Sequence, residues 1–198
     1  MAAEFAVEHA MSLSSPEERE PIHHRRIDCR GYRRKDGLWD IEGHLTDVKS
    51  YAFPNKLRGE IQPGEPLHDM WLRLTLDDSL TVIRAEAATA AAPFAVCPAI
   101  TPAFAKLEGL KIGPGWRRAV AQLLGGIQGC THLVELLGPL ATTAYQTIHT
   151  WNAQRNPRVE TDRPPSHLNT CHALARDGDV VKEHYPKWYV GEEKGSSR

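Results

Sequence analysis

Three ionisable residues occupy inward-facing positions on two predicted strands, where they could transfer protons to and from a bound molecule. Asp47 and Lys49 are two residues apart, so along one strand they share the face of its apolar residues. His68 has the same parity as the methionine and leucines that follow it in a later strand. Ionisable groups that point into an apolar concavity commonly have shifted pKa values and take part in catalysis. We therefore expect all three side chains to line one cavity, with His132 at its rim, and to carry out acid/base chemistry.

Aromatic and cationic residues near these strands extend the candidate site. Tyr32 and Tyr51 each carry a phenolic hydroxyl that could relay a proton, so both belong to the expected catalytic set. Guanidinium and imidazole groups hold anionic oxygens such as phenolates. The expected substrate-binding residues are Arg34, His44, Arg73 and His132. The arginine-rich segment 23–34 has a second interpretation, in which its charges stay in water and prevent edge-to-edge pairing of the sheet.

The inward-facing residues also have structural interpretations. A β-bulge near Thr46 would reverse the alternation, so that Val48 points inward while Asp47 and Lys49 point to water. A histidine on an apolar strand face, such as His68, is more often a hydrogen-bonded core residue than a catalyst. The sequence leaves these interpretations open, and they differ in whether the Asp47 carboxylate is buried.

The elements that must position these residues begin with two β-hairpins. Asp36 and Gly37 lie between two extended runs, and glycine readily adopts the positive φ that a tight hairpin turn requires. A second turn is expected at residues 77–79, within the segment 68–92. Strands that are joined by consecutive hairpins form an antiparallel meander. We predict a curved antiparallel sheet over residues 22–92.

A change to helical periodicity follows the predicted sheet. Apolar residues of segment 116–124 recur at the spacing of one helix face. In segment 131–151 they form a continuous stripe that another surface must cover. The inward face of the predicted sheet is the one large apolar surface available to both helices. The sequence therefore predicts an α+β fold with two long helices packed on one face of the sheet.

Length and composition favour one ordinary domain with short extensions. We expect a flexible leader at residues 1–20, an α+β domain at 21–190 with a small strand around Val180-Val181, and a disordered tail at 191–198. A formal net charge of −1 does not favour nucleic-acid binding, and no apolar run approaches the length of a membrane span. Four single cysteines without a CxxC motif are typical of a reduced cytoplasmic protein.

Ligands for a metal ion are present around the start of the second predicted helix. Cys130, His132 and Glu135 lie close together in the sequence, and Cys97 lies upstream. Thiolate and imidazole suit zinc, and residues three apart share a helix face. However, there is no second ligand pair, and the spacing is not that of a zinc finger. We therefore expect neither a metal nor another cofactor.

Four long motifs carry a resemblance to a known family. They are GYRRKDGLWDIEGHLTDVKSYAF, GEPLHDMWLRLTLD, LEGLKIGPGW and GGIQGCTHLVELLGPLATTAYQT. Over residues 24–185 the chain resembles a bacterial family that is catalogued only as a domain of unknown function, whose members look similar to proteins of aromatic and acyl-chain catabolism. The resemblance implies a cofactor-independent lyase that opens the phenylcoumaran ring of a lignin-derived dimer and releases formaldehyde to give a stilbene.

The candidate residues match the chemical demands of this implied activity. A base at the free phenol drives ring opening to a quinone methide, and deprotonation of the γ-hydroxyl then releases formaldehyde. His68 or Asp47 could accept protons, while Lys49 and Arg34 could stabilise phenolate. The expected partners are a small aromatic substrate and a second copy of the chain in a homodimer, with no nucleic acid or membrane.

Two other classes of function use some of the same residues. A non-enzymatic binding module for an aromatic or acyl ligand needs only one or two polar groups to orient that ligand. A metal-dependent hydrolase would use Cys130 and His132. Convergence of Asp47, Lys49 and His68 within hydrogen-bond reach would favour the lyase over the binding module, because proton transfer needs several groups in one cavity.

Overall fold

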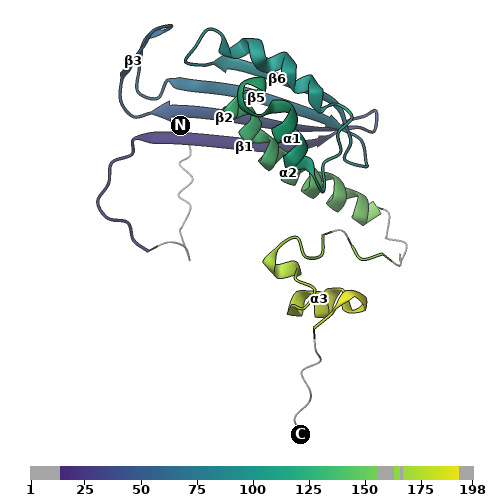
Figure 1. The fold of residues 1–198 in the computed structure, drawn as a ribbon. Coiled ribbons are helices and arrows are strands. Elements are labelled where there is room, and N and C mark those ends of the chain that lie inside the picture. The colour runs from purple at the N-terminus through teal and green to yellow at the C-terminus, as the bar shows by residue number, and fades with distance from the viewer. Residues whose placement is uncertain (1–13, 156–162, 166, 192–198) are drawn as a thin grey trace. The chain divides into compact units, whose positions relative to one another are not determined.

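The computed structural model describes residues 14–155, 163–165 and 167–191 (Figure 1). They form two compact units, which are divided between Asn152 and Ala153. Most of the predicted leader and nearly all of the predicted tail lie outside the described residues. No helix in the described part of the chain combines the length and apolarity needed to cross a bilayer.

The first unit is built on a four-stranded antiparallel sheet in the order β1-β2-β5-β6. Its strands are β1 (His23–Arg33), β2 (Trp39–Lys49), β5 (Pro66–Leu76) and β6 (Val82–Ala91). A separate hairpin of β3 (Phe53–Asn55) and β4 (Gly59–Ile61) is inserted between β2 and β5. Apart from this insertion, strands that follow one another in sequence pair in space, which confirms the predicted antiparallel meander.

The first predicted turn sets the pairing of β1 with β2. Gly37 has a φ of +90°, and the Arg34 amide donates a hydrogen bond to the Leu38 carbonyl at 2.9 Å. From this turn the two strands pair in one uninterrupted register along the whole of β1. The register places Arg25 directly opposite Asp47, near the end of the hairpin that lies farthest from the turn.

The second predicted turn joins β5 to β6. The Asp77 carboxylate accepts hydrogen bonds from the amides of Ser79 at 2.9 Å and Thr81 at 2.8 Å. Between β2 and β5 the register shifts once, at the step from Asp47 to Val48. The shift lies near the end of β2, so the alternation of inward and outward residues holds over most of the strand.

Two long helices, α1 (Trp116–Leu124) and α2 (Thr131–Arg155), lie on one face of this sheet (Figure 1). The 3-10 helices η1 (Cys97–Leu107) and η2 (Gly126–Gln128) precede them in turn. Inward-facing residues of the strands and the apolar stripes of both helices form one core, whose members include Ile41, Leu45, Leu72, Leu136 and Leu140. The predicted α+β fold is therefore confirmed.

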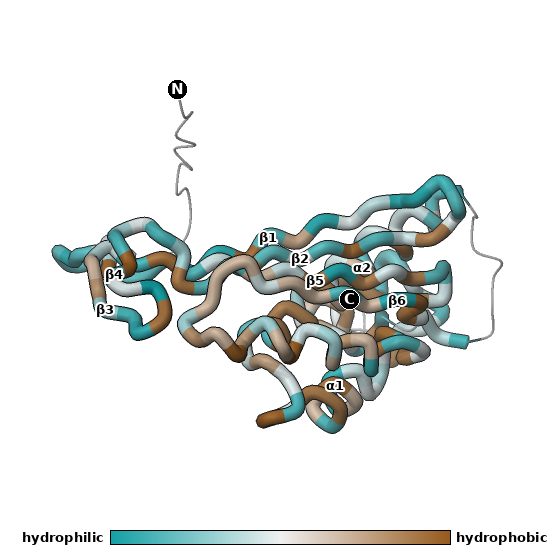
Figure 2. Tube along the Cα trace, turned by 90° about the horizontal axis from the view of Figure 1, so that it is seen from above, coloured by the Kyte–Doolittle hydropathy of each residue, from teal (hydrophilic) through white to brown (hydrophobic). Residues whose placement is uncertain are grey.

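Two glycines allow α2 to approach the sheet closely. A Cβ atom at Gly43 would lie 3.2 Å from the Leu140 side chain, and one at Gly31 would lie 2.1 Å from Thr147 Oγ1. A side chain at Gly31 would overlap Thr147, and one at Gly43 would require the Leu140 side chain to shift by a few tenths of an ångström. In the view from above, hydrophilic and hydrophobic segments alternate along the strands that carry these glycines (Figure 2).

The second unit contains short helices: η3 (His172–Leu174), α3 (Asp179–His184) and η4 (Pro186–Trp188). The predicted strand around Val180-Val181 is wrong, because these residues belong to α3. Asp179 in its first turn and Lys182 in its last complement the helix dipole. Of these two valines Val181 is buried and Val180 is exposed, as expected for neighbouring residues on a surface helix.

Candidate functional site

Asp47 is the centre of the candidate site, and its side chain is 1% exposed. Its position on β2 points it toward the helix-covered face, as the strand parity predicts. Its Oδ1 accepts hydrogen bonds from His23 Nε2 at 3.0 Å and Arg25 Nε at 2.8 Å, and its Oδ2 accepts one from Arg25 Nη2 at 2.8 Å. The interpretation in which a bulge turns Asp47 to water is therefore wrong, since the register shifts only after this residue.

His68 lies beside Asp47 on the neighbouring strand β5. The two residues are direct partners in the register, and His68 is 8% exposed. In the tautomer that satisfies the carboxylate, Nδ1 of His68 donates to Oδ2 of Asp47 at 2.9 Å. The opposite ring nitrogen, Nε2, then carries the lone pair and can accept a proton. A carboxylate that fixes the tautomer and orientation of an imidazole is a common way to prepare a general base.

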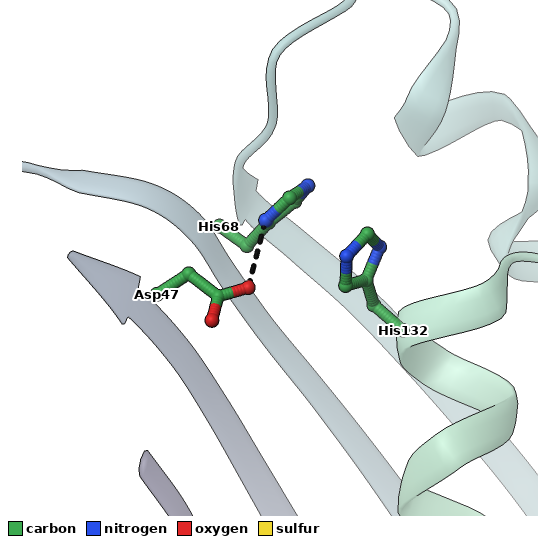
Figure 3. Close-up of side chains that lie close together, drawn as sticks. All are labelled: Asp47, His68 and His132. Atoms are coloured by element: carbon green, nitrogen blue, oxygen red, sulfur yellow. Dashed lines mark hydrogen bonds and ion pairs between the residues drawn. The ribbon is translucent and has the colours of Figure 1, made fainter. Parts of the chain in front are cut away.

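His132 reaches the same place from the first turn of α2 (Figure 3). Its ring centroid lies 3.8 Å from that of His68, with an angle of 32° between the ring planes. Asp47, His68 and His132 thus converge from a central strand, the next strand and a helix, and we call them the Asp-His-His cluster. Two of its members were predicted to line one cavity and the third to lie at its rim.

Arg25 connects the cluster to a second carboxylate. It lies on β1 opposite Asp47, and its guanidinium forms a two-point contact with that carboxylate. Its remaining terminal nitrogen, Nη1, donates to Glu135 Oε2 on α2 at 2.5 Å. The guanidinium therefore ties the sheet to the helix that carries His132.

Burial and neighbouring charges set the protonation states of the cluster. Burial alone would raise the pKa of Asp47, but the hydrogen bonds and charge of Arg25, followed by those of His68, lower this pKa to about 2. Burial and the neighbouring His132 lower the pKa of His68, despite the opposing effect of Asp47. Burial and the charge of Arg25 lower the pKa of His132. Near neutral pH the cluster therefore holds one carboxylate and two neutral imidazoles.

Lys49 and Tyr51, which were predicted to be catalytic, lie outside the cluster. Lys49 is the last residue of β2, where it pairs with His23 of β1. Lys49 Nζ lies 5.4 Å from the ring centroid of Tyr51 and 5.9 Å from that of Phe53. Tyr51 is 44% exposed. These residues form a cation–π group beside the small hairpin.

His44 and Arg73, which were predicted to bind substrate, lie on the opposite face of the sheet. His44 Nε2 pairs with the Asp69 carboxylate at 2.8 Å, and its ring stacks on Trp71. Arg73 Nε donates to the Glu42 carboxylate at 2.8 Å. Both side chains have the parity opposite to that of Asp47 and His68, so they cannot point toward the cluster.

Tyr32 and Arg34 lie toward the turn between β1 and β2. Tyr32 is 44% exposed, and Arg34 donates to the Asp36 carboxylate from Nε at 3.1 Å and from Nη2 at 2.7 Å. The turn and the cluster lie at opposite ends of the same hairpin. Neither side chain is therefore brought to the cluster, and Arg34 instead stabilises the turn.

The metal ligands considered from the sequence do not form a site together. Cys97 and Cys130 are half-buried and pack against the core, and Glu135 is paired with Arg25. Within the described part of the chain, the histidine, cysteine and acidic residues that could hold a metal ion are those of the Asp-His-His cluster, whose ligand atoms lie within 4.8 Å of one another. His132 is the member that the two sets share.

Reasoning from the sequence did not place His23, Arg25 or Glu135 in the network around Asp47, and it considered Glu135 only as a metal ligand. The position of the hairpin turn could have identified His23 and Arg25. Counting outward from Asp36-Gly37 in a regular antiparallel register places Arg25 opposite Asp47. Glu135 had no comparable signal, because its contact depends on how α2 lies on the sheet.

A separate hollow of about 550 Å³ lies between α1 and α2. Its lining includes Trp116, Arg117, Thr142, Tyr145 and Gln146. No member of the Asp-His-His cluster lines it. This volume lies within the range of small-molecule sites, roughly 300–1,000 Å³.

Comparison with known proteins gives a family and no described activity. No curated protein and no solved structure in these comparisons matches the chain. Residues 23–146 match the family described as "Protein of unknown function (DUF2889)". The matched range covers more than half of the 198 residues and contains the whole Asp-His-His cluster together with Arg25 and Glu135. The chain therefore belongs to the DUF2889 family.

Proposed function

We propose that this protein is a lyase that acts on a phenolic aromatic dimer by proton transfer at the Asp-His-His cluster. The observation that carries the proposal is the 2.9 Å hydrogen bond between buried Asp47 and His68, which leaves Nε2 of His68 as an oriented proton acceptor. The resemblance found in the sequence supports the substrate class, a phenylcoumaran whose ring opens with loss of formaldehyde.

The first step is removal of the proton from the free phenol of the substrate. Nε2 of His68 accepts this proton, and Asp47 stabilises the imidazolium that results. The phenolate electrons then form a quinone methide as the benzylic C–O bond of the dihydrofuran ring breaks. The ring oxygen leaves with the electron pair of that bond, as a second phenolate.

The second step is loss of the γ-carbon. His132 is close enough to His68 to accept the γ-hydroxyl proton in the same site. The bond between the β- and γ-carbons breaks, and its electron pair forms the new double bond and restores the aromatic ring. Formaldehyde leaves, and the two phenolate oxygens recover the protons held by the two histidines. The substrate is thereby converted to a stilbene and formaldehyde without net oxidation or reduction.

Arg25 supports this chemistry by holding Asp47 rather than by contacting substrate. Its three polar contacts with Asp47 and Glu135 fix the carboxylate that orients His68. An aspartate that is held on both oxygens cannot rotate away from the imidazole, so the tautomer of His68 stays fixed. Arg25 is therefore a positioning residue.

The direct test is incubation of the purified chain with a phenylcoumaran dimer that carries a free phenol and a γ-hydroxyl, in buffer containing a chelator. Formaldehyde release and stilbene absorbance are followed together. We expect both products in equal amounts and a loss of about two orders of magnitude or more for His68→Ala.

His44→Ala is the matched control, because His44 forms a similar pair with Asp69 on the opposite face of the same two strands. It should keep wild-type turnover. Failure to form either product from any phenylcoumaran, or full turnover by folded His68→Ala, would contradict the proposal.

The hollow between α1 and α2 favours a second candidate function, the binding of an aromatic or acyl ligand without turnover. Ala141 lines this hollow, so Ala141→Trp should fill it. Calorimetric titration with ferulate and with decanoate tests this candidate. Binding that Ala141→Trp abolishes and His68→Ala leaves unchanged would favour it, and the absence of binding by the wild type would exclude these ligands.

A further inference from the structure

We infer that the Asp-His-His cluster is also a binding site for a divalent transition-metal ion, with Zn²⁺ as the best match. Its three side chains offer one carboxylate oxygen and two imidazole nitrogens, and these ligand atoms lie within 4.8 Å of one another. Zinc sites with an open position commonly use three protein ligands of these types. The cysteine-based set considered from the sequence is a different one.

The separation of the ligand atoms is close to what a tetrahedral ion requires. Asp47 Oδ2 and His68 Nδ1 lie 2.9 Å apart. Two ligands at ordinary zinc distances of about 2.0–2.1 Å lie roughly 3.3 Å apart at the tetrahedral angle. Binding therefore requires His68 to move its proton to Nε2 and the two atoms to separate slightly. His132 completes the set from α2, with its ring already 3.8 Å from that of His68.

The surroundings of the cluster support a cation in spite of Arg25. That guanidinium contacts Asp47 and also Glu135, so one positive charge is set against two carboxylates. His23 and Arg25 donate to Asp47 from outside the cluster and would orient it as outer-shell partners orient metal ligands. Repulsion between Arg25 and the ion weakens binding, so we expect micromolar rather than nanomolar affinity.

A metal ion would stop proton transfer, because it occupies the lone pairs that the two histidines need as bases. This consequence rests on the proposed function, whereas binding itself does not. Zn²⁺ is therefore expected to inhibit the lyase, and a chelator is expected to restore it.

The test is calorimetric titration of the full chain with Zn²⁺ after removal of metals by a chelator, without substrate. We expect one saturable site in the wild type, and at least tenfold weaker binding for His132→Ala. His44→Ala on the outer face should bind as the wild type does, because its pair with Asp69 has no third ligand among the described residues. Circular dichroism checks the fold of each variant.

Titration of the wild type with Co²⁺ gives a second measurement that needs no variant. Visible absorption that develops with one equivalent of Co²⁺ and disappears when Zn²⁺ is added supports the site. Absence of saturable Zn²⁺ binding, or wild-type affinity in folded His132→Ala, overturns it.

The proposed metal site and the proposed lyase activity can be refuted independently. Formaldehyde release by a protein that binds no Zn²⁺ overturns the metal site and leaves the lyase. Zn²⁺ binding without formaldehyde release from any phenylcoumaran overturns the lyase and leaves the metal site. Turnover that appears only after Zn²⁺ is added supports the metal site and overturns metal-free proton transfer.

Discussion

Asp47→Asn is the change that tests the electrostatics of the cluster most directly. The pKa of Asp47 is about 2 in the folded protein, against an ordinary value of 3.8. Each unit of difference is worth about 1.4 kcal/mol, so the ionised carboxylate contributes on the order of 2 kcal/mol to the free energy of unfolding at pH 7. An asparagine keeps the shape but loses this charge, and it offers Arg25 one neutral acceptor oxygen where the carboxylate offers two.

The pH dependence of this contribution has a definite sign. A carboxyl whose pKa is lowered by folding stabilises the protein above its unfolded pKa, and the stabilisation is lost as the pH falls through the folded pKa. About half of the contribution of Asp47 should remain at pH 3. The difference in unfolding free energy between wild type and Asp47→Asn should therefore shrink between pH 5 and pH 2.

Urea denaturation with a chelator present, at pH 7 and at pH 3, measures both quantities. Asp69→Asn is the matched control, since Asp69 pairs with His44 on the outer face and is partly exposed. We expect Asp69→Asn to lower the free energy of unfolding by less than about 1 kcal/mol. An Asp47→Asn protein as stable as the wild type at pH 7, or a deficit that is unchanged at pH 3, would refute the reasoning.

Three further outcomes are expected. Gly43→Val should lower the free energy of unfolding, measured by urea denaturation, by about 2 kcal/mol, because even its Cβ would lie 3.2 Å from Leu140. The control Gly138→Ala has open space around it in α2 and should not destabilise the protein. Lys49→Met should keep turnover within about twofold, and a hundredfold loss would place Lys49 in the mechanism. In chelator-treated protein, kcat/KM should fall with acidification at a midpoint below 6.5, because the base must be neutral and the pKa of His68 is lowered; a midpoint above 7 would contradict this.

The sheet and the inward direction of two cluster residues could be predicted because they depend on local rules. The Asp36-Gly37 turn and the alternation along β2 and β5 fix which side chains face the helices. Asp47 and His68 are the last regular pair of β2 and β5 before the register shift at that end of the sheet. Lys49 shares the parity of Asp47, but it is the last residue of β2, and strand parity does not predict that its ammonium lies beside the rings of Tyr51 and Phe53.

The rest of the site depends on contacts that local rules do not determine. Glu135 meets Arg25 across the contact between α2 and the sheet, to which two glycines let the helix come close. The sequence shows the apolar stripe of α2 but not its angle on the sheet. For the same reason His132 was expected only at the rim, whereas its ring lies against His68.

The contacts of Arg25 also predict an order for the events by which this protein folds. Its contact with Asp47 closes a loop of 22 residues within one hairpin, and the contact of Asp47 with His68 spans 21 residues. Its contact with Glu135 spans 110 residues. Closing the longer loop costs more chain entropy, so the sheet contacts should form before α2 docks. Removal of the Glu135 carboxylate should then accelerate unfolding while it leaves the folding rate almost unchanged.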